Sequence, residues 1–237
     1  MVIAVKRMSG DMMKVVCFGD SLTRGVSFVK GRMRILKENY PTLLQQFASE
    51  HFTVINKGVF NDNSDLLVSR VEKDVINEHP DYVIINIGGN DCNFKWDEVA
   101  ERPEDEHQPV VPLDRYLDNI KQLIARIRET GSTPILMTLP PLDPVRYYKL
   151  LANTYGSSIS HWISLQGGIE HWHGLYNRGL NLLAEQLNVD KIDVRSAMNH
   201  SRNLNELISD DGIHLTGEGY KTMSSEIFST FKKYKAI

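Results

Sequence analysis

Five short apolar runs alternate with stretches of helical spacing along this 237-residue chain, and this alternation limits the folds open to it. The clearest run, residues 82–87, is continuous and rich in β-branched side chains. The other four runs lie at residues 15–18, 53–59, 134–139 and 191–194. Continuous rather than alternating apolar character is typical of parallel strands that are covered on both faces.

Helical patterns fill the intervals between these predicted strands. They lie at residues 41–50, 65–78, 114–130, 175–187 and 216–234. Ser64 is placed to cap the second helix, and Gly131 is a natural stop for the third. This alternation predicts a doubly wound α/β sandwich. Right-handed crossovers would then place the carboxyl ends of all strands at one edge of the sheet.

Three connections are longer than this fold requires, and loops of such length are usually functional or mobile. They span residues 23–40, 92–113 and 142–174, and we expect the last two to be long loops near the edge that carries the site. The first contains the basic stretch of residues 30–37. This stretch is either a solvated face or a patch that attracts an anionic ester or a charged surface. The third is rich in aromatic side chains, which either pack under the loop or line an acyl or sugar pocket. They are Tyr147, Tyr148, Tyr155, Trp162, Trp172 and Tyr176.

The composition is that of a globular chain. Hydrophobic residues make up 41% of it, and a formal net charge of -3 lacks the basic excess of a nucleic-acid binder. No apolar window reaches the length of a membrane span, and the N-terminal apolar stretch is too short for a secretory signal. We therefore expect one cytoplasmic domain over residues 1–237, with residues 1–12 as a leader. Cys17 and Cys92 are too few for a disulfide framework, and we interpret them as reduced thiols.

A polar turn, Gly19-Asp20-Ser21-Leu22, follows the first predicted strand. A serine there would be exposed at the carboxyl edge of the sheet, where α/β proteins bind ligands. The alternative is that Ser21 only caps a helix, as most serines in such turns do.

A second polar segment, Asp211-Gly212-Ile213-His214, precedes the last predicted helix. A serine hydroxyl needs a base to act as a nucleophile, normally a histidine, and the histidine needs an acceptor that fixes its tautomer. Asp211 is close enough in sequence to supply that acceptor to His214. Taken alone, Asp211 is an ordinary turn aspartate and His214 an ordinary residue at a helix start.

Two further polar sites end the second and third predicted strands. Gly58 closes the second, and Gly88-Gly89-Asn90-Asp91 follows the third. Acyl transfer requires donors aimed at the developing oxyanion, and backbone N–H groups and asparagine amides both serve. Each site alone is explained as a turn that tolerates positive φ. All four segments together would converge on one edge of the sheet.

These four segments resemble the sequence blocks of the SGNH hydrolases, also called GDSL lipases/acylhydrolases, and occur in the family's order over residues 14–234. The resemblance implies a flavodoxin-like three-layer α/β/α sandwich with a five-stranded parallel sheet in the order 2-1-3-4-5. It also implies that Ser21 is the nucleophile, His214 the base and Asp211 its partner. The oxyanion hole would consist of the Ser21 N–H, Gly58 and Asn90.

The implied function is a serine esterase that forms an acyl-enzyme and requires no cofactor and no metal. Its substrate would be a small acyl ester, an acetylated sugar or a lysolipid-type ester. One departure is the segment after Gly58, because the family often continues this block with a further Gly and a Thr. Here residues 59–64 read Val-Phe-Asn-Asp-Asn-Ser.

Three other interpretations compete with this one. A catalytically dead relative used for binding is disfavoured because Ser21, Asn90, Asp211 and His214 are all present. A metal enzyme is disfavoured because His171 and His173, two apart, cannot share a helix face, and neither they nor His161 have a Cys or carboxylate at zinc spacing. A non-catalytic flavodoxin-like module that binds a nucleotide or phosphate is the stronger alternative. It is disfavoured because the turn between Gly19 and Gly25 lacks the known phosphate-loop signatures.

Overall fold

The computed structural model describes residues 12–47, 52–201 and 203–233, so the expected leader lies almost wholly outside the described residues. A five-stranded parallel sheet in the order β4-β1-β5-β6-β7 forms its centre. The strands are β1 (Met13–Gly19), β4 (Phe52–Gly58), β5 (Tyr82–Asn86), β6 (Thr133–Met137) and β7 (Asp190–Ile192). Counted within this sheet alone, the order is 2-1-3-4-5, as expected from the sequence. The labels β2 and β3 belong to a separate hairpin.

Strand β1 lies between β4 and β5 in the middle of the sheet. Its last residue, Gly19, pairs with Gly58 on one side and with Asn86 on the other. Because the three strands are parallel and in register here, the segments that follow them begin side by side. The turn of Ser21 and the turn of Asn90 therefore leave the sheet at the same edge.

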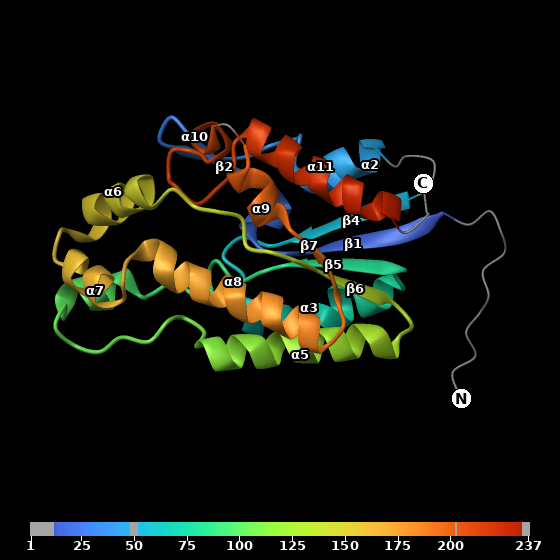
Figure 1. Cartoon of the computed structure of the whole chain (residues 1–237), viewed down its shortest axis with the longest axis horizontal. Coiled ribbons are helices and arrows are strands. Elements are labelled where there is room, and N and C mark those ends of the chain that lie inside the picture. The colour runs from blue at the N-terminus through green and yellow to red at the C-terminus, as the bar shows by residue number, and fades with distance from the viewer. Residues whose placement is uncertain (1–11, 48–51, 202, 234–237) are drawn as a thin grey trace.

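Helices cover both faces of the sheet, giving the expected three layers (Figure 1). One face packs against α3 (Ser64–Asp74), α5 (Leu113–Glu129) and α8 (Ile169–Gln186). The other face packs against α2 (Tyr40–Phe47), α9 (Val194–Asn199) and α11 (Gly217–Lys233). Along β1, Val16 and Phe18 face the first layer, and Val15 and Cys17 face the second. Both faces are buried, which explains the continuous apolar character of the strands.

Helix α3 differs from its prediction at both ends. Its cap is Asn63 rather than Ser64, because the Asn63 side chain accepts the Leu66 N–H at 3.1 Å. The helix stops at Asp74, and a short 3-10 helix, η1 (Ile76–Glu78), completes the predicted span. The stop predicted for α5 is confirmed, since Gly131 follows its end with φ +83°.

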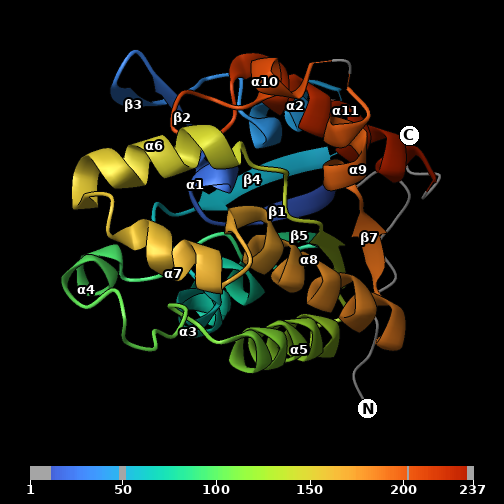
Figure 2. The same ribbon diagram turned by 60° about the vertical axis from the view of Figure 1, so that its left-hand side comes forward.

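The expected loop at residues 142–174 is wrong, because most of it is helical (Figure 2). It contains α6 (Pro144–Tyr155), α7 (Ile159–Leu165) and the first turns of α8. Asp143 caps α6 by accepting the Val145 and Arg146 N–H groups at 3.0 Å, and Pro144 occupies the first turn, where its missing N–H is tolerated. Residues 92–113 contain α4 (Trp96–Glu101) and otherwise lack regular secondary structure until α5 begins at Leu113.

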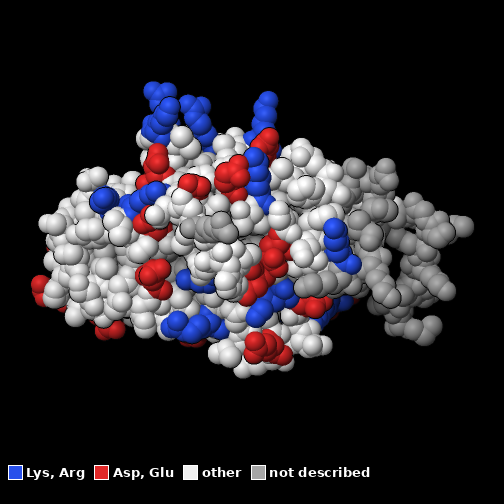
Figure 3. All heavy atoms as spheres, turned by 45° about the horizontal axis from the view of Figure 1, so that its top comes forward, with Lys and Arg blue, Asp and Glu red and all other residues white. Residues whose placement is uncertain are grey.

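The basic stretch lies largely in the exposed strand β3 (Arg32–Ile35) of a hairpin whose other strand, β2 (Val26–Val29), begins buried after the short helix α1 (Ser21–Arg24). Lys30, Arg32 and Arg34 are exposed, as a solvated face requires. Figure 3, in which the top of Figure 1 is turned forward, shows Lys and Arg side chains projecting from the upper outline. The helix α10 (Leu204–Leu207) precedes the segment of Asp211. Among the described residues, no helix is both long and apolar enough to cross a membrane.

Candidate active site

Ser21 is the first residue of α1, directly after the central strand β1. The cap of this helix is Asp20, whose Oδ1 accepts the Leu22 N–H at 2.9 Å, so the serine hydroxyl is not needed for capping. Ser21 is only 7% exposed and lines a cavity. Burial raises the pKa of the neighbouring Asp20 to about 7 against the opposing effect of that backbone hydrogen bond.

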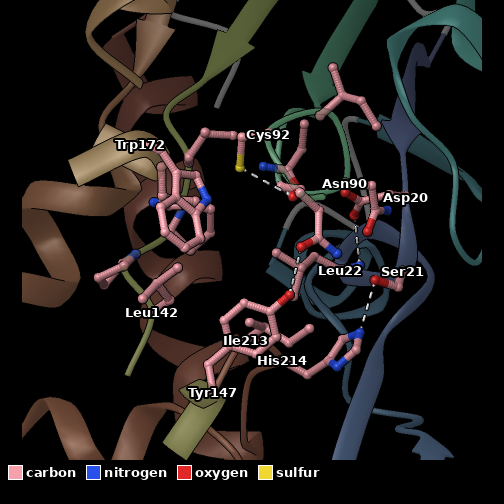
Figure 4. A pocket seen from close by; sticks show the side chains of 18 residues that line it. Asp20, Ser21, Leu22, Asn90, Cys92, Leu142, Tyr147, Trp172, Ile213 and His214 are labelled. Atoms are coloured by element: carbon pink, nitrogen blue, oxygen red, sulfur yellow. Dashed lines mark hydrogen bonds between the residues drawn. The ribbon is translucent and has the colours of Figure 1, made fainter. Parts of the chain in front are cut away.

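His214 contacts both Ser21 and Asp211 (Figure 4). Its Nε2 lies 2.9 Å from Ser21 Oγ, and its Nδ1 lies 2.5 Å from Asp211 Oδ2. The three side chains are 3–7% exposed. One chain of hydrogen bonds thus links Ser21 to His214, which is 193 residues away in the sequence, and His214 to Asp211, which is three residues away. The structure brings these predicted residues together.

The carboxylate of Asp211 is held rigidly. Its Oδ1 accepts the N–H groups of Ile213 and His214 at 3.1 and 3.0 Å, and the Ser209 hydroxyl at 3.1 Å. Burial opposes ionisation of Asp211, but the hydrogen bonds from His214 and the backbone outweigh it and lower the pKa of this carboxyl. A charged Asp211 accepts from Nδ1, which leaves Nε2 of a neutral His214 free to accept a proton from Ser21.

Asn90 lies in the same cavity, at the turn after β5. Figure 4 places it beside Asp20 and Ser21, and places Trp172 and Leu142 on the opposite wall. One hydrogen of its amide is bound to the Asp62 carbonyl at 2.7 Å, which fixes the side chain and leaves the second hydrogen available. The cavity measures about 680 Å³ including its open mouth.

The sequence profile of the GDSL-like Lipase/Acylhydrolase family matches residues 17–222, which include all four segments. The chain belongs to this family. It is therefore a carboxylic ester hydrolase, and the resemblance drawn from the sequence is confirmed. The sheet order and the three layers agree with that assignment.

Two curated relatives resemble this GDSL hydrolase over most of its length. The GDSL esterase/lipase At5g62930 of Arabidopsis thaliana is 24% identical over 225 residues, which are 93% of this chain and 86% of the relative. The uncharacterized lipoprotein YqeF of Bacillus subtilis is 25% identical over 181 residues, which are 76% of this chain and 69% of the relative.

Solved structures share the fold of this GDSL hydrolase. The lipase/acylhydrolase from Enterococcus faecalis superimposes with a TM-score of 0.67 at 22% identity, covering 94% of this chain and 97% of that one. The acetylxylan esterase Axe2 of Geobacillus stearothermophilus gives a TM-score of 0.62 at 21% identity, covering 93% and 94% of the two chains. Axe2 was solved as two catalytic mutants, one lacking a histidine and one lacking a serine.

Gly58, the remaining predicted donor, does not lie in the cavity. Its N–H is bound to Asn56 Oδ1 at 2.9 Å, and a Cβ at this position would lie 2.1 Å from the Arg24 nitrogen. Glycine is needed here because β4 packs directly on α1, so the predicted role of Gly58 as an oxyanion donor is wrong. In the segment after Gly58, where the GDSL family often has a further glycine, the chain turns at Asn61. The φ of Asn61 is +62°, in the left-handed region that otherwise favours glycine.

The aromatic side chains of residues 142–174 and of α8 divide between the wall of the cavity and the packed core. Tyr147 and Trp172 line the cavity, whereas Trp162 and Tyr176 are buried in the core. Tyr155 is 38% exposed and does neither. The segment thus builds one wall of the cavity of this GDSL hydrolase on packed helices rather than on a loop.

The sequence did not single out two residues in and behind this wall. Asn93 lines the cavity, and Arg195 lies behind it with Nη1 3.2 Å from Nδ1 of His173. No motif marks either residue, because both are placed by contacts between distant segments. The three histidines weighed as metal ligands are dispersed: His161 contacts Glu104 at 3.2 Å, His171 is exposed and His173 faces the cavity.

Proposed function

We propose that this hydrolase cleaves its ester through an acyl-enzyme formed on Ser21. The observation that carries the proposal is the chain of hydrogen bonds from Asp211 through His214 to Ser21 inside the cavity. Ser21 Oγ attacks the ester carbonyl carbon while its proton passes to His214 Nε2. The tetrahedral adduct then collapses, and the departing alcohol takes that proton.

Water completes the cycle in the second half of the reaction. His214 removes a proton from a water molecule that attacks the acyl carbon, and returns it to Ser21 Oγ as the carboxylic acid leaves. Asp211 holds the imidazole in the tautomer with a proton on Nδ1 and stabilises the imidazolium that forms in each half-reaction. The similarity to Axe2, whose catalytic mutants replace a serine and a histidine, supports these roles.

The oxyanion would be bound by the Ser21 N–H and by the free hydrogen of the Asn90 amide. Ser21 is at the first position of α1, where a backbone N–H has no acceptor within the helix. We assign no third donor, because the Gly58 N–H is bound to Asn56 and, among the described residues, the cavity is lined by neither Gly58 nor Asn61. The Asp62 carbonyl holds the Asn90 amide in its place beside Ser21.

The substrate class we propose is an ester of a small acyl group, with acetylated sugars as the first candidates. The cavity supports this, because Leu139, Pro140, Pro141 and Leu142 line it and Ser21 lies among its lining residues. The similarity to an acetylxylan esterase points to the same class. The proposed reaction needs a small-molecule ester and water as reactants, and none of its steps uses a cofactor.

A fluorophosphonate probe tests the nucleophile directly. Wild-type protein should gain one adduct at Ser21, located by mass spectrometry, and should hydrolyse p-nitrophenyl esters or acetylated sugars in a panel from acetate to palmitate. Ser21→Ala should lose on the order of 10⁶ in kcat with an unchanged Tm. An unmodified Ser21, or more than a tenth of the activity in Ser21→Ala, contradicts the mechanism and favours a binding module.

We also propose that residues 1–237 form one domain that acts in the cytoplasm. Both hydrophobic clusters pack on the same sheet, and Cys17 and Cys92 are buried and unpaired. Limited proteolysis should leave one resistant core, and cell fractionation should place the protein with cytoplasmic markers. Recovery with membranes would contradict the location and agree with the lipoprotein relative.

A further inference from the structure

Uncharged polar side chains lie in the cavity wall in addition to the residues of the reaction, and His173 and Asn93 are two of them. His173 follows Trp172 on α8, and Asn93 lies on the segment after β5. The surrounding wall is mostly apolar or aromatic, with Leu142 and Tyr147 among its members. A buried polar group without a partner is costly, so the roles of these two need an explanation.

The tautomer of His173 is determined by Arg195. Nη1 of Arg195 lies 3.2 Å from His173 Nδ1 and is itself positioned by the Leu139 carbonyl at 3.3 Å. A guanidinium can only donate, so Nδ1 must accept and the ring proton must be on Nε2. Burial, with the charge of Arg195 adding to it, lowers the pKa of His173 to about 3, so the ring is neutral near pH 7.

His173 Nε2–H is therefore a fixed donor. The residue is 6% exposed and lines the cavity, and its Nε2 has no hydrogen-bond partner among the described residues. Arg195 makes no ion pair within the same described part of the chain. Its positive charge behind the ring polarises the Nε2–H bond and favours an electron-rich acceptor.

The orientation of Asn93 is fixed in the same way. Its Oδ1 accepts the indole N–H of Trp96 at 2.7 Å and the hydroxyl of Tyr147 at 2.9 Å. An indole nitrogen can only donate, so the atom facing it must be the amide oxygen. The oxygen thus has both of its acceptor sites occupied, and the NH₂ group has no partner within the described residues.

We propose that His173 and Asn93 form a donor-only subsite that binds oxygen atoms of the substrate outside the ester group. This inference rests on the proposed function, since it assigns substrate contacts within the same cavity. A hydroxyl, an ether oxygen or a carboxylate oxygen satisfies the donors, whereas a hydrocarbon group leaves them unpaired. Sites built to hydrogen-bond a substrate oxygen discriminate strongly against analogues that lack it.

Pairs of substrates with matched size test the preference on either side of the ester. On the acyl side, 4-nitrophenyl 3-methoxypropanoate is compared with 4-nitrophenyl pentanoate, and with the monoester of succinate as the anionic member. On the alcohol side, monoacetylated methyl xyloside is compared with cyclohexyl acetate. Wild-type enzyme should show a kcat/KM at least tenfold higher for the oxygenated member of one pair. The pair that responds identifies the source of the oxygen.

Variants assign this preference to the two donors. His173→Phe keeps the ring but removes the donor, and should lower kcat/KM about tenfold for the oxygenated substrate while the hydrocarbon substrate is unaffected. His173→Gln restores a donor and should recover most of the preference. Asn93→Asp keeps the acceptor for Trp96 and Tyr147 but replaces the NH₂ group, and should also reduce the preference. His171→Phe, an exposed change two residues away, is the matched control.

A spectroscopic measurement separates this inference from the proposed function. Long-range ¹H–¹⁵N spectra of the imidazole should show His173 protonated on Nε2 alone, and methyl β-xyloside or acetate should shift that signal in Ser21→Ala protein. A proton on Nδ1, or a preference that survives both His173→Phe and Asn93→Asp, overturns the subsite. If wild-type protein hydrolyses no ester, but His173 is protonated on Nε2 and its signal shifts with methyl β-xyloside or acetate, the proposed function is overturned and the subsite is not.

Discussion

Asp211 uses both carboxylate oxygens, and this makes it sensitive to the smallest substitution. Oδ1 accepts two backbone N–H groups and Ser209, and Oδ2 accepts from His214. An amide must turn its NH₂ toward one of these donors, so Asp211→Asn reverses a hydrogen bond and releases the tautomer of His214. We expect kcat to fall on the order of 10⁴ with little change in KM, measured by steady-state kinetics.

Asp210 is the control for this change. It is exposed, and its carboxylate accepts the backbone N–H of Lys30 at 3.0 Å rather than contacting His214. Asp210→Asn should leave kcat within a factor of two. If Asp210→Asn is the damaging variant and Asp211→Asn is active, the partner assigned to His214 is wrong.

Asn90 offers a second test at the residue scale. Removing its amide deletes one proposed oxyanion donor, so Asn90→Ala should lower kcat by about 10²–10³ while KM changes little. The variant also frees the Asp62 carbonyl, and a thermal melt will show whether the fold is retained. A folded variant with kcat within threefold of wild type would exclude the amide as a donor.

At the scale of elements, the start of α3 distinguishes two neighbouring caps. Asn63 caps the helix, whereas Ser64 accepts the Asn119 amide at 2.8 Å and is buried. Asn63→Ala should lower the free energy of unfolding by about 1 kcal/mol, and Asn63→Ser should restore most of it, because serine also caps well. Urea denaturation measures both. Equal losses for Ala and Ser would mean that the side chain does not act as a cap.

The elements that the sequence mispredicted share a physical cause. The helices α6 and α7 were missed because aromatic and glycine content outweighed a two-residue start signal, Asp143-Pro144. The family resemblance implies that Gly58 belongs to the oxyanion hole, whereas in the structure this glycine allows the close approach of the Arg24 backbone. The Asp143-Pro144 pair and Gly58 are both visible in the sequence. The neighbours that determine what each of them does are set by tertiary packing.

The stability of the whole molecule should depend on the burial of Asp20. Its pKa is about 7 in the folded protein and near 3.8 when unfolded, so between these values only the folded state keeps the proton. The contribution of Asp20 to the free energy of unfolding therefore falls as the pH rises from 4 to 7 and is constant above. Asp20→Asn keeps the acceptor for Leu22 and removes the charge, so its gain in Tm should be near zero at pH 4 and largest at pH 8.

Thermal melts at pH 4, 6 and 8 measure this dependence. Asp210→Asn serves again as the control, because Asp210 is exposed and should not change the pH profile. A gain in Tm that is the same at all three pH values would place the effect of Asp20→Asn in packing rather than in ionisation.

The sequence predicted the plan of the whole molecule better than its details. The five strands and their order followed from continuous apolar runs and from the family resemblance, and the segments of Ser21, Asn90 and His214 were expected at one edge. Those features depend on local patterns that many contacts reinforce. The wall of His173, Asn93 and Arg195 depends on individual side-chain contacts between separate segments, and no periodicity encodes such contacts.

The distance along the chain between Ser21 and His214 also has a consequence for biosynthesis. The two residues are 193 positions apart, and His214 precedes α11, whose apolar side chains share a hydrophobic cluster with Val15 and Cys17 of β1. During translation the serine emerges early, and its base emerges only shortly before that helix. In a nascent chain, Ser21 therefore has no base until the segment of His214 has been synthesised and has folded against it.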